Sequence, residues 1–287
     1  MHELQTIDLD HISLSVRMAG DPADPTIVFL HGFPENNSMW IQQVEYFSNL
    51  GYHVLAPDLR GFHLSDKPPL VADYTAHEIG RDINALVAYF DKSAYILVGH
   101  DLGGMVAWHL SIVYPERIKK TVIINMPHML AYRKYGLRRW QQIARSWYVF
   151  FFQLPYLPEL VGKLSNYRIL ANSMRGSAMP GTFDEEDLED LIEAWKYENA
   201  LTTMINLYRA EARHRFNYEP YNQGRVKNPV QILWGVKDRY LIKELPEWSL
   251  EWCDQADLEY FEDASHWIVK EMPGVVNRKI RQFLEQA

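Results

Sequence analysis

Residues 95–110 decide the fold of this chain, and they read YILVGHDLGGMVAWHL. The continuous apolar run from Tyr95 to Val98 predicts a buried strand of a parallel sheet. The apolar residues among 105–110 recur at helical spacing and predict a helix that follows at once. Glycines at positions 99, 103 and 104 permit a tight turn and close packing of helix on strand. The segment therefore predicts a strand, a turn with Asp101 at its exposed tip, and a helix.

The rest of the first third repeats this alternation of apolar runs and helical patterns. Residues 12–18 alternate like a half-buried strand. Three further runs are continuously apolar, as central parallel strands are: Thr26–Leu30, Val54–Ala56 and Val122–Ile124. Thr75 and Glu78 have the spacing of a capping box, which predicts a helix from there to Val87. The pattern indicates βαβ units around a parallel sheet.

The alternation stops after Asn125. Residues 127–225 are helical in pattern and rich in aromatic side chains, and then Val230–Trp234 and Leu258–Phe261 restore strands before a closing helix after Pro273. We therefore predict an α/β core domain made of residues 1–126 and 226–287. The helical segment 127–225 is predicted to be a cap inserted into that core.

Composition excludes several classes of partner. The 287 residues include 29 Lys and Arg against 37 Asp and Glu, a net charge of −8, and no long basic run that would attract nucleic acid or anionic lipid. The single cysteine, Cys253, excludes an intramolecular disulfide and a cysteine metal cluster, and we interpret it as a packed core residue. The most apolar segment, Trp147–Leu160, is too short and too rich in proline to span a bilayer. With no signal-like N-terminus, we expect a cytoplasmic protein that needs neither metal nor cofactor.

The turn at Asp101 has the strand–turn–helix context of a nucleophile elbow. Its residue is an aspartate, and a carboxylate attacks an sp³ carbon that carries a leaving oxygen or halide, giving an alkyl–enzyme ester. The alternative is an aspartate that caps a helix beside ordinary turn glycines. A G-x-D-x-G pattern alone would favour that alternative, but the context favours the nucleophile.

Residues 31–35, His-Gly-Phe-Pro-Glu, follow a predicted strand that should lie beside the elbow. The backbone N–H groups of Phe33 and Leu102 are predicted to form an oxyanion hole around the Asp101 carboxyl carbon, which becomes tetrahedral when water cleaves the ester. Glu35 either holds the attacking water or interacts with a helix dipole, and the sequence favours neither reading. We interpret His31 and His100 as structural residues.

Two late strands lead into the predicted acid and base. Asp238 follows the strand 230–234, and His266 follows the strand 258–261. The order nucleophile, acid, histidine is that of α/β hydrolases, with Asp238 orienting His266 so that its other ring nitrogen activates water. No carboxylate directly follows the strand that ends at Ile124, which favours Asp238. Asp263 is interpreted as ordinary turn chemistry.

The motifs HGFPE, DLRGF, GHDLGGM, YPER and SHW together resemble those of the α/β-hydrolase epoxide hydrolases along essentially the whole chain. The resemblance implies an α/β-hydrolase fold, with a mostly parallel eight-stranded sheet flanked by helices and an inserted helical cap. Residues 148–155 and 206–209 resemble the two cap segments that carry this family's paired tyrosines. It therefore implies that Tyr148 and Tyr208 polarise the oxygen of a small apolar epoxide, which water converts to a diol.

The chain departs from the commonest family pattern at Leu102, where many relatives carry tryptophan. The backbone N–H survives this change, but the floor of the pocket differs. Phe150, Phe151 and Trp267 are candidates for the lining of an apolar pocket.

Other functions stay open at this point. A haloalkane or haloacid dehalogenase shares the aspartate nucleophile, but it needs halide donors that Leu102 does not supply. A serine esterase would need a hydroxyl at the elbow. A non-catalytic binding protein of the same fold would normally have lost part of the constellation. The sequence leaves both a monomer and a homodimer open.

Overall fold

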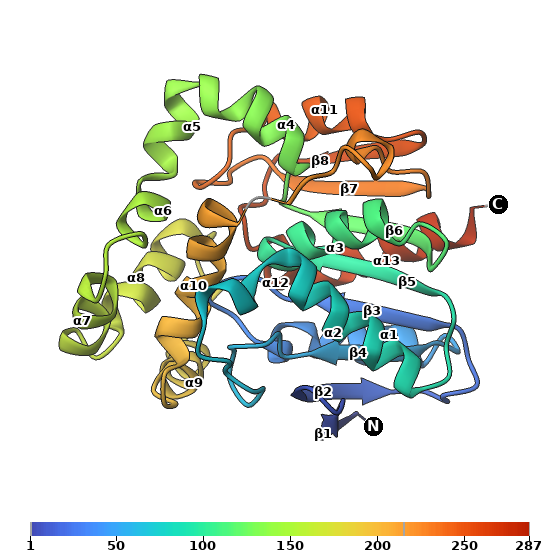
Figure 1. Cartoon of the computed structure of the whole chain (residues 1–287), viewed down its shortest axis with the longest axis horizontal. Helices are drawn as coiled ribbons and strands as arrows, with labels where there is room; N and C mark the ends of the chain where they lie inside the picture. The colour runs from blue at the N-terminus through green and yellow to red at the C-terminus, as the bar shows by residue number, and fades with distance from the viewer. Residues whose placement is uncertain (1, 215, 287) are drawn as a thin grey trace.

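The computed structural model describes residues 2–214 and 216–286, and its centre is a single sheet (Figure 1). Within these residues the strand order is β1-β2-β4-β3-β5-β6-β7-β8. The first two strands are antiparallel to their neighbours, and all pairs from β4 to β8 are parallel. The strands are β1 (Glu3–Asp8), β2 (Ser13–Ala19), β3 (Thr26–Leu30), β4 (His53–Pro57), β5 (Tyr95–His100), β6 (Ile118–Ile124), β7 (Val230–Gly235) and β8 (Ala256–Phe261). This sheet confirms the mostly parallel α/β architecture.

The strands near the centre of the sheet are apolar because both of their faces are covered. Every residue of β3, β4, β5 and β7 is buried, as expected of parallel strands between two helical layers. The sequence analysis missed β1. Five of its six residues are exposed, so this edge strand carries no apolar run for a sequence pattern to detect.

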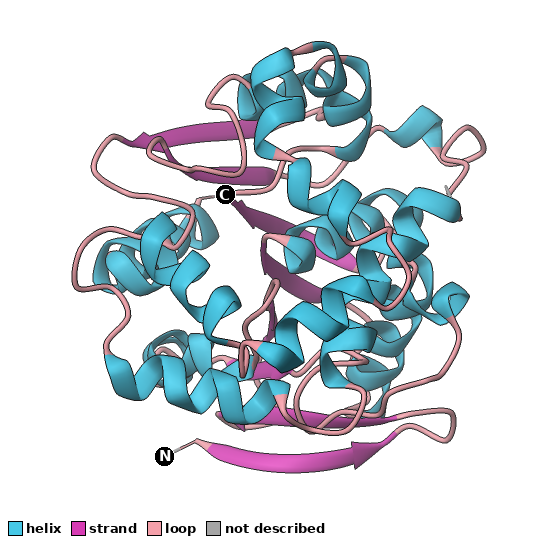
Figure 2. Ribbon diagram, turned by 90° about the vertical axis from the view of Figure 1, so that its left-hand side faces the viewer, coloured by secondary structure: helices cyan, strands magenta, loops and turns pink. Residues whose placement is uncertain are grey.

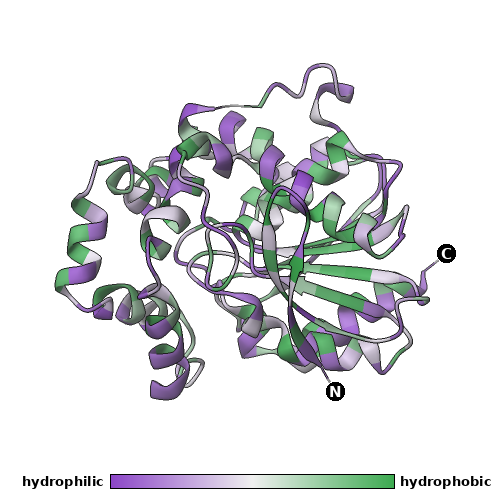
Figure 3. Ribbon diagram, turned by 60° about the horizontal axis from the view of Figure 1, so that its bottom comes forward, coloured by the Kyte–Doolittle hydropathy of each residue, from purple (hydrophilic) through white to green (hydrophobic). Residues whose placement is uncertain are grey.

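Helices cover the two faces of the sheet (Figure 2). One apolar cluster joins α1 (Ile41–Ser48) and α13 (Pro273–Glu285) to the sheet, and another joins α2 (Ala76–Tyr89) and α3 (Leu102–Val113). The Thr75 side chain accepts the Glu78 N–H at 3.3 Å, so the predicted N-cap of α2 is confirmed. Colouring by hydropathy shows the central strands as the apolar layer (Figure 3).

Among the residues that the structure describes between β6 and β7 there are seven α-helices, and we call this helical segment the cap. They are α4 (Met129–Lys134), α5 (Trp140–Arg145), α6 (Trp147–Phe151), α7 (Leu157–Leu164), α8 (Arg168–Ser177), α9 (Glu185–Trp195) and α10 (Ala200–Arg213). The helices from α5 to α10 lie at the left in Figure 1, and α4 lies at the top beside α11 (Leu245–Ser249). No helix of the described residues is long and apolar enough to cross a membrane.

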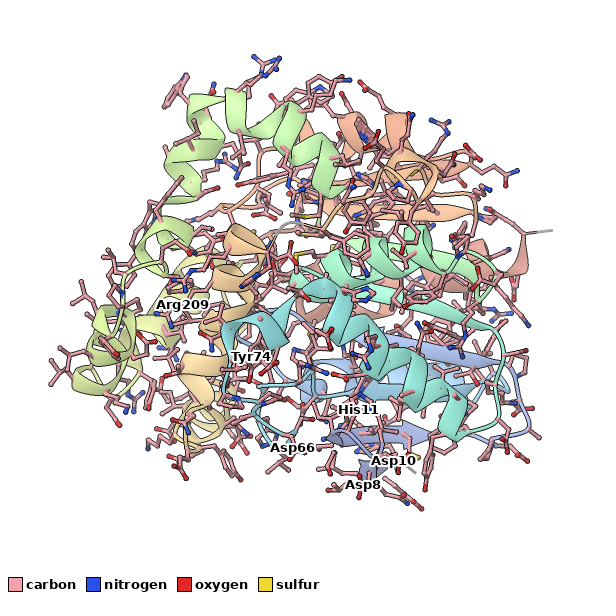
Figure 4. All side chains as sticks on the ribbon, viewed as in Figure 1. Asp8, Asp10, His11, Asp66, Tyr74 and Arg209 are labelled. Carbon is pink, nitrogen blue, oxygen red and sulfur yellow. The ribbon has the colours of Figure 1, made fainter. Side chains whose placement is uncertain are left out.

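Hydrogen bonds fasten the cap internally and to the core. Arg209, labelled in Figure 4, donates to the Phe152 carbonyl at 2.9 Å and to the Leu154 carbonyl at 3.0 Å, and it forms an ion pair with Glu159. It thereby ties α10 to the chain between α6 and α7. The indole N–H of Trp195 donates to the Pro34 carbonyl at 2.7 Å. This last contact attaches α9 to the loop that follows β3.

Candidate active site

The turn between β5 and α3 holds Asp101 in a strained backbone conformation. Its φ is +48° and its ψ is −124°, a region that most non-glycine residues avoid. A Cβ at Gly103 would overlap the Leu30 carbonyl, and one at Gly32 would overlap the Asp101 side chain. The glycines therefore let α3 begin directly against β3. The carboxylate is left at the carboxyl end of the sheet, facing the cap.

Two backbone N–H groups bind the carboxylate of Asp101. The Phe33 N–H donates to Oδ2 at 2.9 Å, and the Leu102 N–H also donates to this side chain. Burial raises the pKa of Asp101 above its ordinary value, although the nearby His266 and the two amides act in the opposite direction. The predicted oxyanion pair and the predicted nucleophile therefore lie together.

His266 lies between two carboxylates. Its Nδ1 is 2.7 Å from Asp238 Oδ2, and its Nε2 is 3.8 Å from Asp101 Oδ1. Burial by itself lowers the pKa of His266, but Asp238, Asp101 and Glu35 raise it to about 9. Asp263, in contrast, is exposed and forms an ion pair with Lys237, away from this cluster.

Asn125 is a member of the site that the sequence analysis missed. Its Nδ2 donates to Asp238 Oδ2 at 2.7 Å, and its Oδ1 accepts the Gly235 N–H at 2.9 Å. The N–H groups of Tyr240 and Leu241 bind Asp238 Oδ1. Although burial raises the pKa of Asp238, these donors and His266 lower it below its ordinary value. The position of Asn125 after a strand was the one available signal.

Tyr148 on α6 and Tyr208 on α10 lie across from the nucleophile. Their ring centroids are 5.9 Å apart at an interplanar angle of 85°. Burial, and then the charge of Asp101, raises the pKa of both phenols well above the ordinary value. Both hydroxyls are therefore protonated at neutral pH and can donate hydrogen bonds.

Two cavities meet at these residues. The α8-side cavity, of about 160 Å³, extends toward α8, and the α4-side cavity, of about 190 Å³, extends toward α4. Both are lined by Asp101, Tyr148, Tyr208 and Tyr240. The carboxylate and the two phenols therefore lie where the two cavities meet. A substrate can place its reacting atoms there while its two substituents occupy the two cavities.

The predicted pocket residues divide in position. Phe151 and Trp267 line the α8-side cavity, and Leu102 lines the α4-side cavity. Phe150 lines neither, and 58% of it is exposed, so its assignment to the pocket was wrong. On the short helix α6 the side of Tyr148 faces inward, as does Phe152 just after the helix, and Phe150 falls on the opposite side.

Glu35 is buried beneath the site and faces His100. Its Oε2 is 3.6 Å from His100 Nδ1, and neither atom has a hydrogen-bond partner within the described residues. His100 Nε2 is 2.8 Å from the His266 carbonyl and must donate to it. Burial raises the pKa of Glu35 to about 8, and it lowers the pKa of His100 to about 3. At neutral pH a protonated Glu35 therefore faces an unprotonated nitrogen.

Comparison with known proteins agrees with this architecture. Residues 25–273 match the family model described as alpha/beta hydrolase fold, so the chain belongs to the α/β-hydrolase family. The AB hydrolase superfamily protein YfhM of Bacillus subtilis is 36% identical over 281 residues, which is 98% of this chain and 97% of the relative. Epoxide hydrolase 4 of Homo sapiens is 33% identical, covering 93% of this chain and 74% of the relative.

Solved structures give the same result. The crystal structure of Bacillus megaterium epoxide hydrolase with an inhibitor superposes with a TM-score of 0.87 and 25% identity, covering 98% of this chain and 100% of the other. Within the α/β hydrolases, the chain thus belongs to the epoxide hydrolase family, whose members are hydrolytic enzymes. The fold and the family that the sequence motifs predicted are both confirmed.

Proposed function

We propose that this enzyme hydrolyses apolar epoxides to vicinal diols through a covalent ester on Asp101. One observation carries the proposal: a carboxylate held by two backbone N–H groups shares a cavity junction with two protonated phenols. An epoxide needs both a nucleophile at carbon and hydrogen-bond donors at oxygen, because ring opening leaves an alkoxide. This site can supply both at once.

In the first step, Oδ1 of Asp101 attacks one ring carbon while that carbon's bond to the epoxide oxygen breaks. Oδ2 is held by the Phe33 N–H, so Oδ1 is the oxygen left to react. Tyr148 and Tyr208 donate hydrogen bonds to the departing oxygen, and one of them transfers its proton. The products of this step are a hydroxyalkyl ester and a tyrosinate, which later recovers a proton from solvent or from His266.

In the second step, a water molecule adds to the carboxyl carbon of the Asp101 ester, and His266 Nε2 takes a proton from that water. Esterification removes the negative charge of Asp101, which helps to raise the pKa of His266 to about 9 in the free enzyme. The pKa of His266 therefore falls when the ester forms, and the ring becomes able to act as a base. The oxyanion on Oδ2 is bound by the Phe33 and Leu102 amides. When it collapses, the bond between the carboxyl carbon and Oδ1 breaks, the departing alkoxide takes the proton that His266 accepted, and the diol leaves with Oδ1 while the oxygen from water remains in the Asp101 carboxylate.

We propose that Glu35 helps to position the water used in this second step. Its carboxyl group is close enough to His266 for each of the two to shift the pKa of the other, and the charge of Asp101 helps to raise the pKa of Glu35. The facing, unpartnered atoms of Glu35 and His100 can both bind a water molecule. His100 was interpreted as structural from the sequence, and its bond to the His266 carbonyl supports that reading as well.

A dehalogenase is the nearest rival because it would use the same carboxylate. Leu102 offers no side-chain donor to a halide, and the donors that face Asp101 from the cap are the two phenols. An esterase that acylates serine is not supported, because the elbow residue is Asp101. A non-catalytic protein would have no need for a histidine that lies 2.7 Å from one buried carboxylate and 3.8 Å from the carboxylate at the elbow.

The deciding experiment traps the ester. His266→Gln keeps a polar side chain but removes the base that activates water. After exposure to an epoxide, this variant should therefore retain the hydroxyalkyl group as an ester on Asp101. Intact-protein and peptide mass spectrometry would measure the adduct after separate panels of epoxides and haloalkanes. His11→Gln is the control, because Figure 4 shows His11 beside the β1–β2 edge, far from the cap.

Addition of a whole epoxide mass to the peptide that contains Asp101, in the His266→Gln protein alone, is the expected result. An alkyl adduct formed only from haloalkanes would replace the proposal with dehalogenation. An adduct on any other residue would exclude Asp101 as the nucleophile.

A further inference from the structure

One segment of the cap carries most of the exposed apolar side chains that the structure describes. Eighteen large hydrophobic residues are exposed, and eleven of them fall between Leu137 and Ile169. Tyr156, Leu164 and Trp140 are the most exposed, at 83%, 79% and 74%. Soluble monomers rarely leave so many apolar side chains together in water unless the surface binds something. We call the surface of α5, α6 and α7 the outer cap face.

The same segment is basic within an acidic protein. Residues 133–175 contain eight Lys and Arg and one acidic residue, Glu159, while the whole chain carries a net charge of −8. Glu159 is nearly buried in its ion pair with Arg209. Arg138, Arg139 and Lys163 are exposed and form no ion pair with any described residue, although the Arg139 guanidinium lies over the ring of Trp248 in the core. The outer cap face therefore presents apolar side chains among uncompensated positive charges.

The acidic residues of the cap lie elsewhere. Residues 184–198 contain eight Asp and Glu against one lysine, and Glu185 there forms ion pairs with Arg168 and Arg175. Figure 1 shows α9, which carries most of these acids, at the lower end of the cap and α5 at the upper end. The positive charges at the end near α9 are neutralised, whereas those of the outer cap face are not.

The α8-side cavity opens on this face. Trp147 on α6 and Ile169 on α8 line that cavity and are also largely exposed, so they form its rim. Phe151 and Val161, which are partly exposed, line it further in. A continuous apolar path therefore runs from the outer cap face to Asp101.

We propose that the outer cap face docks onto an anionic phospholipid surface, from which apolar substrates enter the α8-side cavity. Surfaces that lie in a bilayer interface combine Trp, Tyr and Leu with Lys and Arg, as this one does. A second copy of the chain is a poorer occupant, because a two-fold contact would bring the same positively charged surface of both copies together. The sequence analysis predicted no attraction to anionic lipid because the cations form no run; the fold gathers them.

Binding to lipid goes beyond the proposed reaction, and its test does not measure turnover. The full chain is mixed with vesicles of phosphatidylcholine alone, or of phosphatidylcholine with 30% phosphatidylglycerol, and the bound fraction is measured by flotation. We expect binding to the anionic vesicles at low salt, much weaker binding to the neutral ones, and release as salt is raised.

Three variants separate the apolar and charged contributions. Trp140→Ser with Tyr156→Ser and Leu164→Ser should weaken binding at least roughly tenfold, because it removes the side chains that enter the interface. Arg138→Gln with Arg139→Gln and Lys163→Gln should weaken it roughly 100-fold. The matched control replaces exposed apolar residues of the core: Leu4→Ser, Leu70→Ser and Tyr89→Ser.

Retention of binding by the core variant and its loss in both cap variants would support the proposal. Equal loss in the core variant, equal binding to neutral vesicles, or no binding by the wild type would overturn it. Light scattering gives a further check. A dimer that Trp140→Ser with Leu164→Ser converts to a monomer would assign the face to self-association and overturn the lipid proposal.

Discussion

The two halves of the candidate active site are built differently. In the core, Asp101, Asp238 and His266 each follow a strand, and hydrogen bonds fix their carboxylates and ring. In the cap, Tyr148 and Tyr208 stand on helices and pack edge to face on each other and on neighbouring rings. The first half is fixed by backbone geometry, and the second depends on how helices pack.

This difference assigns different tasks to the two halves. A nucleophile and a base must keep their distance from the ester carbon through two steps, which a rigid sheet edge provides. Donors to an epoxide oxygen must instead adapt to substrates of different shape, and aromatic rings on cap helices can shift with their neighbours. We therefore expect substitutions of the core residues to abolish the reaction, and substitutions of the cap residues to slow it to different degrees.

The largest effect should come from Asp101→Ala. Removal of the nucleophile leaves no route to the ester, and we expect diol formation to fall by at least roughly 10⁴-fold, to the background. The measurement is the diol yield from an epoxide that the wild type turns over. Asp263→Ala, which removes an exposed carboxylate from a neighbouring turn, should leave turnover unchanged. Diol formation at the normal rate by Asp101→Ala would break the mechanism.

The next effect tests the cap half. Tyr148→Phe and Tyr208→Phe should each slow ring opening by about 10- to 100-fold, because general-acid assistance is worth about 10²–10⁴ in all. Single-turnover kinetics should show slower ester formation, with ester hydrolysis unchanged.

A third tyrosine of the junction serves as the control for these variants. The Tyr240 hydroxyl is 2.9 Å from Ser177 Oγ, so it is already engaged, and Tyr240→Phe should have little effect on ring opening. If Tyr240→Phe slowed ester formation as much as the other two variants do, the assignment of the donor pair would be wrong.

The core half of the site was predictable because the sequence shows which residues follow the buried strands of a parallel sheet. Buried strands are apolar runs, and the residue after each run lies at the same edge of the sheet. Asp238 and His266 were predicted from this position alone. It missed the part played by Asn125, because an asparagine after a strand is ordinary turn chemistry until its partners are known. It also missed β1, whose side chains face water.

The cap half was not predictable in this way. Helical periodicity alone could not separate Tyr148 and Tyr208 from other tyrosines, and only the resemblance to a family selected them. The prediction that Phe150 lines the pocket failed for the same reason. A helix of five residues has too little periodicity to distinguish its buried side from its exposed side. The pairing of Glu35 with His100 joins residues 65 positions apart, and it required the fold.

A smaller effect concerns the buried acid beneath the junction. Glu35 has a pKa of about 8 in the folded protein, raised from 4.5 by burial. Between these values the folded chain keeps a proton that the unfolded chain has lost, so stability falls as pH rises, by about 1.4 kcal/mol per unit. Glu35→Gln does not titrate. Relative to wild type it should gain roughly 2–4 kcal/mol at pH 8 and almost nothing at pH 4.5.

Urea unfolding at several pH values measures this difference. The same variant should slow ester hydrolysis about tenfold while ester formation is unchanged, because the proposed water is used only in the second step. A stability difference that does not depend on pH would show that Glu35 is ionised in the folded protein.

The smallest effect tests what holds the cap half in place. Ser177 Oγ on α8 donates to the Met174 carbonyl and therefore accepts from Trp267 Nε1 and from the Tyr240 hydroxyl, each at 2.9 Å. Ser177→Ala leaves two donors beside His266 without that acceptor, and should lower stability by roughly 1–2 kcal/mol. Turnover should change by no more than about threefold, because the packed rings still position the phenols.

Ser165→Ala is the matched cap control for this variant, since within the described part of the chain Ser165 Oγ bonds only to the nearby Gly162 carbonyl. Urea unfolding and turnover of one epoxide distinguish the outcomes. A loss of turnover beyond 100-fold with unchanged stability would mean that a single hydrogen bond, rather than the packing of aromatic rings, sets the position of the cap over His266. The two halves of the site would then be held in the same way, and the contrast between a rigid core and an adaptable cap would fail.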